Sequence, residues 1–198
     1  MSRPYENFIN VVGDKKELER FISLIVNYTE DESFIDFNRI IPMPKEIMGT
    51  DKEKEWAYDN WGCYLGCHSF EDFEYEFPST DYCLKMYEHS IQLSFITENG
   101  SPCLVMPEIY KQFPNLHFEW IYSACEGYHC GYVINDRTFV VADENYNYEF
   151  AKILYDFCWC EDECEEMLIE KVPNHPLCFV KCLNWLLSGQ EYISCQDE

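Results

Sequence analysis

The sequence predicts an α+β protein in which an antiparallel β-sheet has helices on one face and a helical extension follows at the C-terminus. Three observations indicate this class. Short apolar or alternating stretches, typical of strands, recur between residues 8 and 141, and stretches with helical three- and four-residue spacing separate them. After residue 144 an acidic run and two prolines separate two further helical stretches. We therefore expect a domain over residues 1–144, with an acidic, Cys-rich extension, 145–198, packed on it.

The first half of the predicted domain is a strand, a helix and a second strand. Phe8–Val12 is the first strand, and Asp14 is the predicted N-cap of the helix, with Glu17 in the capping-box position. We expect about four helical turns. The apolar face of this helix comprises Leu18, Phe21, Ile22, Ile25 and Val26. The bulky run Phe34–Ile41 predicts a largely buried strand, ended by proline, around which the chain is organised.

The second half repeats the alternation of strands and helices. The predicted elements are a short helix within Lys45–Asp59, a strand at Ile91–Thr97, a helix carrying Leu104, Ile109 and Phe113, a strand at Leu116–Ala124, a hairpin over Gly131–Val141, and helices at Tyr148–Cys158 and Leu177–Leu187. Pro107 fits the first turn of its helix, where no N–H is needed. The hairpin is expected to turn at Asn135-Asp136. Glu71–Phe77 fits either a two-faced strand or an acidic loop, and Tyr82–His89 is ambiguous.

This order of elements is that of a split β-α-β, ferredoxin-like fold. Four stretches also resemble the YubB-like ferredoxin-like family of plasmid- and phage-encoded proteins. They are Asp36–Pro44 (DFNRIIPMP), Asn60-Trp61-Gly62, Leu93-Ser94-Phe95 with Ser101-Pro102, and Phe113–Leu116 (FPNL). The resemblance covers roughly residues 7–140. It implies a ferredoxin-like sheet and a mobile-element origin, and it supplies no catalytic residue.

The charge of the chain limits its partners. The sequence has 14 Lys and Arg against 37 Asp and Glu, so the formal net charge is 14 − 37 = −23. Such a field repels nucleic acid and anionic membrane surfaces and attracts basic proteins, so we expect no direct nucleic-acid or membrane binding. The N-terminus lacks the pattern of a secretory signal, and we expect a cytoplasmic protein in a host cell. The 12 cysteines are then expected to be reduced and mostly buried.

Zinc binding through the C-terminal cysteines is an alternative. Cys160 and Cys164 are four residues apart, as are Cys178 and Cys182, so each pair would share a helical face and two helices could offer four sulfurs. Cys178 and Cys182 are equally compatible with core positions. Two weaker groups are Cys63, Cys67 and His68, and Cys125, His129 and Cys130. Because no Cys-x-x-Cys knuckle and no Gly-rich phosphate loop occurs, we expect no cofactor and no enzymatic activity.

Acidic clusters interleaved with aromatic residues are the main functional signal. The predicted partner-binding residues are Glu71, Asp72, Glu74, Glu76, Glu161, Asp162, Glu163, Glu165 and Glu166. Rows of carboxylates can occupy a groove that binds DNA or RNA, and exposed aromatics can anchor the contact. The sequence therefore favours an anti-defence, anti-CRISPR-like inhibitor that mimics nucleic acid and blocks a basic host protein such as a CRISPR effector or other nuclease. An enzyme or metal-binding module, a self-associating structural protein, and acidity that serves only solubility remain open alternatives.

Overall fold

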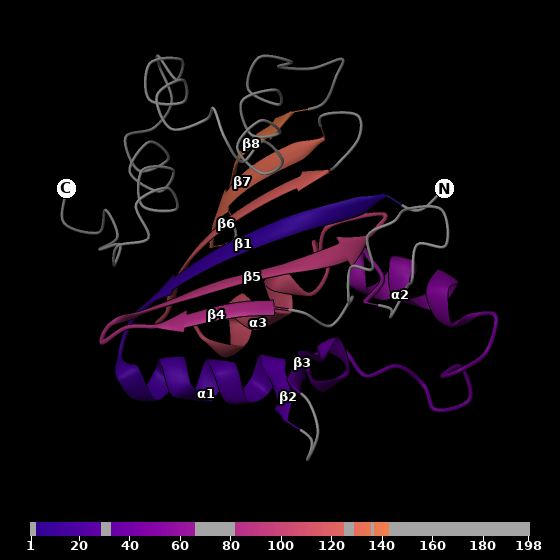
Figure 1. Cartoon of the computed structure of the whole chain (residues 1–198), viewed down its shortest axis with the longest axis horizontal. Coiled ribbons are helices and arrows are strands. Elements are labelled where there is room, and N and C mark those ends of the chain that lie inside the picture. Colours follow the sequence, from indigo (N-terminus) through magenta and orange to yellow (C-terminus); the bar gives the residue numbers. More distant parts are fainter. Residues whose placement is uncertain (1–2, 29–32, 66–81, 125–128, 136, 143–198) are drawn as a thin grey trace.

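The computed structural model describes residues 3–28, 33–65, 82–124, 129–135 and 137–142, with the backbone alone for 82–83 and 137–142 (Figure 1). The elements are β1 (Pro4–Val12), α1 (Lys15–Ile25), β2 (Val26–Tyr28), β3 (Ser33–Ile35), the 3-10 helix η1 (Phe37–Arg39), α2 (Glu53–Trp61), β4 (Tyr82–Met86), β5 (Ser90–Glu98), α3 (Met106–Gln112), β6 (His117–Ala124), β7 (Cys130–Ile134) and β8 (Arg137–Ala142). This part of the chain is a mixed α and β structure, as predicted. The stretches predicted at Glu71–Phe77, Tyr148–Cys158 and Leu177–Leu187 lie outside the described residues.

The main sheet has six strands in the order β4-β5-β1-β6-β7-β8, and all neighbours are antiparallel. Strand β1 is central, because it pairs with β5 on one side and β6 on the other. Pro4 pairs with Glu98 at one end of β1, and Val12 pairs with Ser90 and His117 at the other. We call these the Pro4 end and the Val12 end of the sheet. Strands β2 and β3 form a separate two-stranded sheet.

The helices pack on the sheet face that carries the odd-numbered residues of β1, here called the first face. The α1 residue Phe21 meets Phe118 on β6 edge to face, with ring centroids 5.4 Å apart, and Tyr110 of α3 lies 5.2 Å from the same ring. Figure 1 shows α1 and α3 on the same side of the sheet. Four of the five residues of the predicted apolar face of α1 are confirmed, since Leu18, Phe21, Ile22 and Ile25 are buried on the helix. Val26 is not on the helix, because it is the C-cap and begins β2. The Asp14 cap is also confirmed, by a hydrogen bond from the Lys16 N–H of 2.9 Å.

The strand predicted at Phe34–Ile41 is wrong. Only Ser33–Ile35 is extended, as β3, and it pairs with β2 outside the main sheet. The chain turns at Asp36, whose Oδ1 accepts from the Asn38 N–H at 3.0 Å and caps η1. A short acidic side chain that accepts a hydrogen bond from the backbone two residues later competes with strand pairing. At Asp36 this local hydrogen bond ends the strand. The β-α-β unit predicted for the first half is therefore wrong as well, and α1 is 11 residues long, about three turns.

The predictions for the second half are closer to the structure. Strands β5 and β6 and the β7–β8 hairpin lie where they were expected, and Asn135 adopts the positive φ, 51°, that the hairpin turn needs. Helix α3 has Pro107 in its first turn. Leu104 is not part of its buried face, because it precedes the helix and is 44% exposed. The helix predicted within Lys45–Asp59 forms only from Glu53, as α2.

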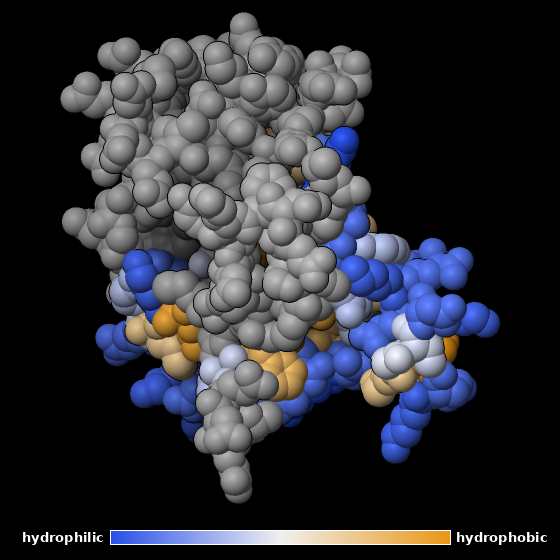
Figure 2. All heavy atoms as spheres, turned by 45° about the vertical axis from the view of Figure 1, so that its right-hand side comes forward, coloured by the Kyte–Doolittle hydropathy of each residue, from blue (hydrophilic) through white to orange (hydrophobic). Residues whose placement is uncertain are grey.

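Most of the described surface in the view of Figure 2 is hydrophilic, with smaller apolar patches. The exposed large apolar residues are Tyr28, Met48, Met86 and Leu104. Within the described ranges, no helix combines the length and the apolar character needed to cross a bilayer.

Candidate functional site

The predicted partner-binding acids and the four thiols of the main zinc candidate lie outside the described residues. These are the acids Glu71, Asp72, Glu74, Glu76, Glu161, Asp162, Glu163, Glu165 and Glu166, and the thiols Cys160, Cys164, Cys178 and Cys182. Of the two weaker metal groups, Cys63, His129 and Cys130 are described, and Cys67, His68 and Cys125 are not. In the part of the chain that the structure describes, no three His, Cys, Asp or Glu side chains are grouped as metal ligands would be.

The acidic charge is divided unevenly between the described fold and the rest of the chain. The described residues carry 11 Lys and Arg against 14 Asp and Glu, so their net charge is 11 − 14 = −3. The other residues carry 3 basic and 23 acidic side chains, or 3 − 23 = −20. The folded sheet and its helices are thus nearly neutral, and the segments attached to them hold almost all of the excess charge.

Segment 66–81 is attached near the Pro4 end of the sheet. Just before it, Tyr64 forms an isolated antiparallel bridge with Glu98, the last residue of β5. Just after it, Tyr82 begins β4 and pairs with Phe95, also on β5. Both attachment points therefore lie on the last part of one strand. The segment between them has 5 acidic residues and no basic one.

Two more acidic segments are attached at the same end. Segment 125–128 joins β6 to β7, between Ala124, which pairs with Tyr5, and Cys130. Segment 143–198 follows Ala142, which ends β8 and pairs with Cys130. Together with 66–81 these segments carry 3 basic and 19 acidic residues, or 3 − 19 = −16. The strand register therefore gathers the attachment points of most of the negative charge at the Pro4 end.

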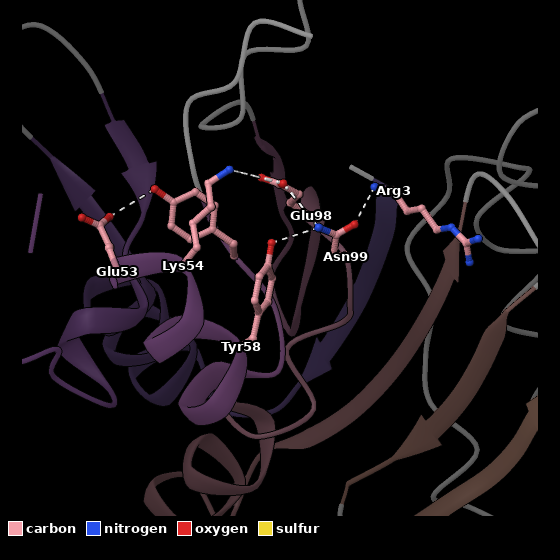
Figure 3. Close-up of polar contacts among 7 residues, drawn as sticks. Arg3, Glu53, Lys54, Tyr58, Glu98 and Asn99 are labelled. Carbon is pink, nitrogen blue, oxygen red and sulfur yellow. Dashed lines mark hydrogen bonds and ion pairs between the residues drawn. The ribbon is translucent and has the colours of Figure 1, made fainter. Parts of the chain in front are cut away.

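A chain of polar contacts joins α2 to the bridge at this end (Figure 3). The Lys54 ammonium lies 3.5 Å from the Glu98 carboxylate and 5.1 Å from the centre of the Tyr64 ring. The Tyr64 hydroxyl donates to Glu53 at 3.1 Å. Lys54 and Glu53 both come from the first turn of α2, so this helix holds Tyr64, two residues before segment 66–81.

Asn99 continues the same contacts to the N-terminal strand. Its backbone has a positive φ of 56°. Its Oδ1 accepts from the Arg3 N–H at 2.7 Å, and its Nδ2 donates to the Tyr58 hydroxyl at 3.0 Å (Figure 3). Burial raises the pKa of the Tyr58 phenol, so it stays protonated at neutral pH. These contacts anchor the chain, and they contain no nucleophile paired with a base.

Glu6 is a partly buried acid near the Pro4 end of the sheet. It lies on the face opposite the helices, where it pairs in register with Ile96 and Ser123. Burial raises the pKa of its carboxyl to about 7. At neutral pH this acid is therefore only partly ionised, and it adds little to the negative field around it.

The Val12 end carries a buried carboxylate and histidine that resemble a catalytic or metal-binding pair. Glu119 is 1% exposed, and its Oε1 lies 3.3 Å from His117 Nε2, while its Oε2 accepts from Asn10 Nδ2 at 3.3 Å. Both residues fall within a predicted strand, but no sequence signal distinguished this pair from other acid–histidine neighbours.

Asn135 contacts the second nitrogen of the His117 ring. Its Oδ1 accepts from the Phe118 N–H at 2.8 Å, so the atom that faces His117 Nδ1, at 3.5 Å, is the donor Nδ2. This contact favours the tautomer in which Nδ1 accepts from Asn135 and Nε2 donates to Glu119. In that tautomer His117 and Asn10 both donate to the buried Glu119 carboxylate, a role that serves the fold.

Comparison of the chain with protein-family models, with curated proteins and with solved structures gives no match.

Proposed function

We propose that this protein is an inhibitor that binds a basic nucleic-acid-binding host protein, such as a CRISPR effector or another nuclease, and blocks it by occupancy. The acidic segments attached at the Pro4 end supply the contact, and they mimic a nucleic acid. The supporting observation is the division of charge. A fold of net charge −3 holds, at one end of its sheet, the ends of segments that carry −16.

Electrostatics favours this arrangement over a uniformly acidic surface. Carboxylates concentrated on one side raise the local potential and steer a basic partner into one orientation, whereas scattered charges are screened separately. Screening at physiological salt acts over about 8 Å, so charges must lie within that range of one another to act together. Attachment points that share one end of a sheet favour such proximity.

A ferredoxin-like origin of the central sheet is part of this proposal. The order β4-β5-β1-β6, with α1 after β1 and α3 between β5 and β6, is the order that a split β-α-β fold would give. The β2–β3 sheet, η1 and α2 would then be an insertion after α1, and β7–β8 an added hairpin. The relation to the YubB-like family, the mobile-element origin, the absence of enzymatic activity and the cytoplasmic location are proposed on the same footing.

Charge-neutralised variants test the proposal against a purified Cas9-type effector. One variant changes Glu71, Asp72, Glu74 and Glu76 to Gln or Asn, and a second changes Glu161, Glu163, Glu165 and Glu166 to Gln. A matched control changes four acids exposed on the described fold, Glu46, Asp51, Glu55 and Asp59.

Calorimetric titration of the effector, at low and high salt, compares these proteins. We expect at least one of the two test variants to lose about tenfold or more in affinity at low salt, and the control to lose about twofold or less. Wild-type affinity should fall as salt rises. Binding that is absent, or that weakens equally in all three variants, would contradict the proposal.

A further inference from the structure

The second face of the sheet, which carries the even-numbered residues of β1, is more deeply buried than the described elements explain. Besides Ser90 at the start of β5, the buried residues on this face are Asn10, Glu119, Ile121, Ser123, Cys130 and Tyr132, each at most 1% exposed. The described helices pack on the first face through residues such as Phe21 and Phe37. Consistently, Ile121, Cys130 and Tyr132 are buried but do not belong to the hydrophobic core that those helices form.

Burial on this face increases across the sheet toward β8. On β5, the second-face residues Gln92, Ser94 and Ile96 are only partly buried, and Ser90, at the turn from β4, is buried. On β6 and β7, the corresponding residues, from Glu119 to Tyr132, are almost completely buried. Whatever covers this face therefore lies over β6 and β7, next to the strand at which the described chain ends.

We infer that residues 143–198 cover this face, with Leu177–Leu187 in direct contact over β6 and β7. The segment begins directly after Ala142 on β8, so it reaches the buried region without crossing the sheet. Nine of the 11 residues of Leu177–Leu187 are apolar, the exceptions being Lys181 and Asn184. A helix that is apolar nearly all round needs to be buried on several sides.

The dimensions fit this occupant. An 11-residue helix is about 16 Å long, at 1.5 Å per residue. Strands in a sheet lie about 4.8 Å apart, so such a helix spans the three strands β1, β6 and β7 with room at its ends. Docking there holds the acidic run Glu161–Glu166, which precedes Leu177–Leu187 in the chain, close to the folded body. The inference does not depend on the proposed inhibitor function.

Alkylation of the native thiols tests the docking in the full-length chain. The Cys130 thiol is buried on the second face, Cys63 is buried in the first-face core, and Cys103 is exposed. Leu183→Asp with Leu186→Asp should loosen the contact, and Lys181→Glu with Asn184→Asp is the matched control at the polar positions. Peptide mass spectrometry after a short iodoacetamide pulse reads each cysteine separately.

We expect Cys130 to become alkylated about tenfold faster in the Leu variant and to stay protected in the control, while Cys63 stays protected in both. Unchanged protection of Cys130 in the Leu variant would overturn the inference. If Cys63 also reacts, the whole fold has opened, and a second measurement decides.

For that measurement, a protease site is inserted after Ala142 in the full-length chain, which is then cut under native conditions. Co-elution of the two pieces on gel filtration, with Cys130 still protected, supports the docking. Separation of the pieces with Cys130 still protected would overturn it. If the uncut chain has the mass of a dimer and the pieces separate after the cut, the inference is overturned. A second copy of the chain would then cover the face.

Discussion

Tyr64 and Glu98 exchange both backbone hydrogen bonds of an isolated bridge, with N–O distances of 3.1 and 2.9 Å. The bridge ties Tyr64, two residues before the acidic segment 66–81, to the Pro4 end of the sheet. Asn99, the next residue of the chain, then connects this end to Arg3 and Tyr58.

Replacing Asn99 should weaken the Pro4 end. Asn99→Ala removes the acceptor for the Arg3 N–H and the donor to Tyr58, and it places alanine at a φ of 56°. We expect the free energy of unfolding in urea to fall by about 2–3 kcal/mol. Asn99→Gly keeps the backbone conformation accessible and should cost roughly 1 kcal/mol less. If the free energy of unfolding falls equally in the two variants, the positive φ at position 99 contributes nothing to the cost of Asn99→Ala.

Two glycines with positive φ should respond differently to alanine. A Cβ on Gly62, at a φ of 83°, would lie 2.6 Å from Cys103 Sγ and 2.9 Å from the Ser101 carbonyl oxygen. A Cβ on Gly49, at a φ of 73°, would meet nothing within 4 Å. Gly49→Ala therefore measures the backbone strain alone, about 1 kcal/mol, and Gly62→Ala should cost about 1–3 kcal/mol more. Thermal unfolding of the two variants checks this order, and equal costs would contradict the close approach at Gly62.

Moving the carboxylate from Glu119 to position 10 should destabilise the fold less than either substitution made alone. In Glu119→Gln, the amide nitrogen must face a donor from either His117 or Asn10, and we expect a loss of about 1–3 kcal/mol. Adding Asn10→Asp restores an acceptor for that nitrogen, so the double variant should regain most of the loss. Urea unfolding of the two single variants and the double variant measures the coupling, and simple additivity would refute the assigned hydrogen bonds.

Glu6 should make stability depend on pH in an unusual direction. Its folded pKa, about 7, is above the ordinary value of 4.5, so the folded state holds an extra proton between these values. The Glu6 contribution therefore favours the folded state at low pH and is lost as pH rises from about 4.5 to 7. Glu6→Gln should remove this part of the pH dependence and be the more stable protein at pH 8. A difference between wild type and variant that does not change with pH would contradict the raised pKa.

Local signals predicted most of the elements of the fold. The Asp14 cap, the alternation in β5, the proline in the first turn of α3 and the Asn135 turn each depend on neighbouring residues only, and each appears in the structure. The strand predicted at Phe34–Ile41 failed because its bulky residues indicated burial but not pairing. Phe37 is indeed buried, against Trp61 and Phe95, yet it lies in a 3-10 turn.

The arrangement of the candidate site could not be predicted from the sequence, because it depends on strand register. Nothing local shows that Tyr64 pairs with Glu98, or that Ala142 pairs with Cys130, and these pairings decide where the acidic segments are attached. Likewise, His117 meets Asn135, which lies in the turn after β7, only because β7 pairs with β6. The acidic residues themselves were identified from sequence, and their role as a contact surface remains a prediction.

The most direct test of the central claim is competition between this protein and DNA for a purified Cas9-type effector. A labelled duplex is bound to the effector, and its fluorescence anisotropy is followed as the wild-type chain is added. The same titration is repeated with the two charge-neutralised test variants and with the control. The test variants are neutralised at Glu71, Asp72, Glu74 and Glu76 or at Glu161, Glu163, Glu165 and Glu166, and the control at Glu46, Asp51, Glu55 and Asp59. We predict that the wild type and the control displace the duplex at similar concentrations, and that at least one of the two test variants requires about tenfold more. Failure of the wild type to displace the duplex, or equal displacement by all four proteins, would contradict the account.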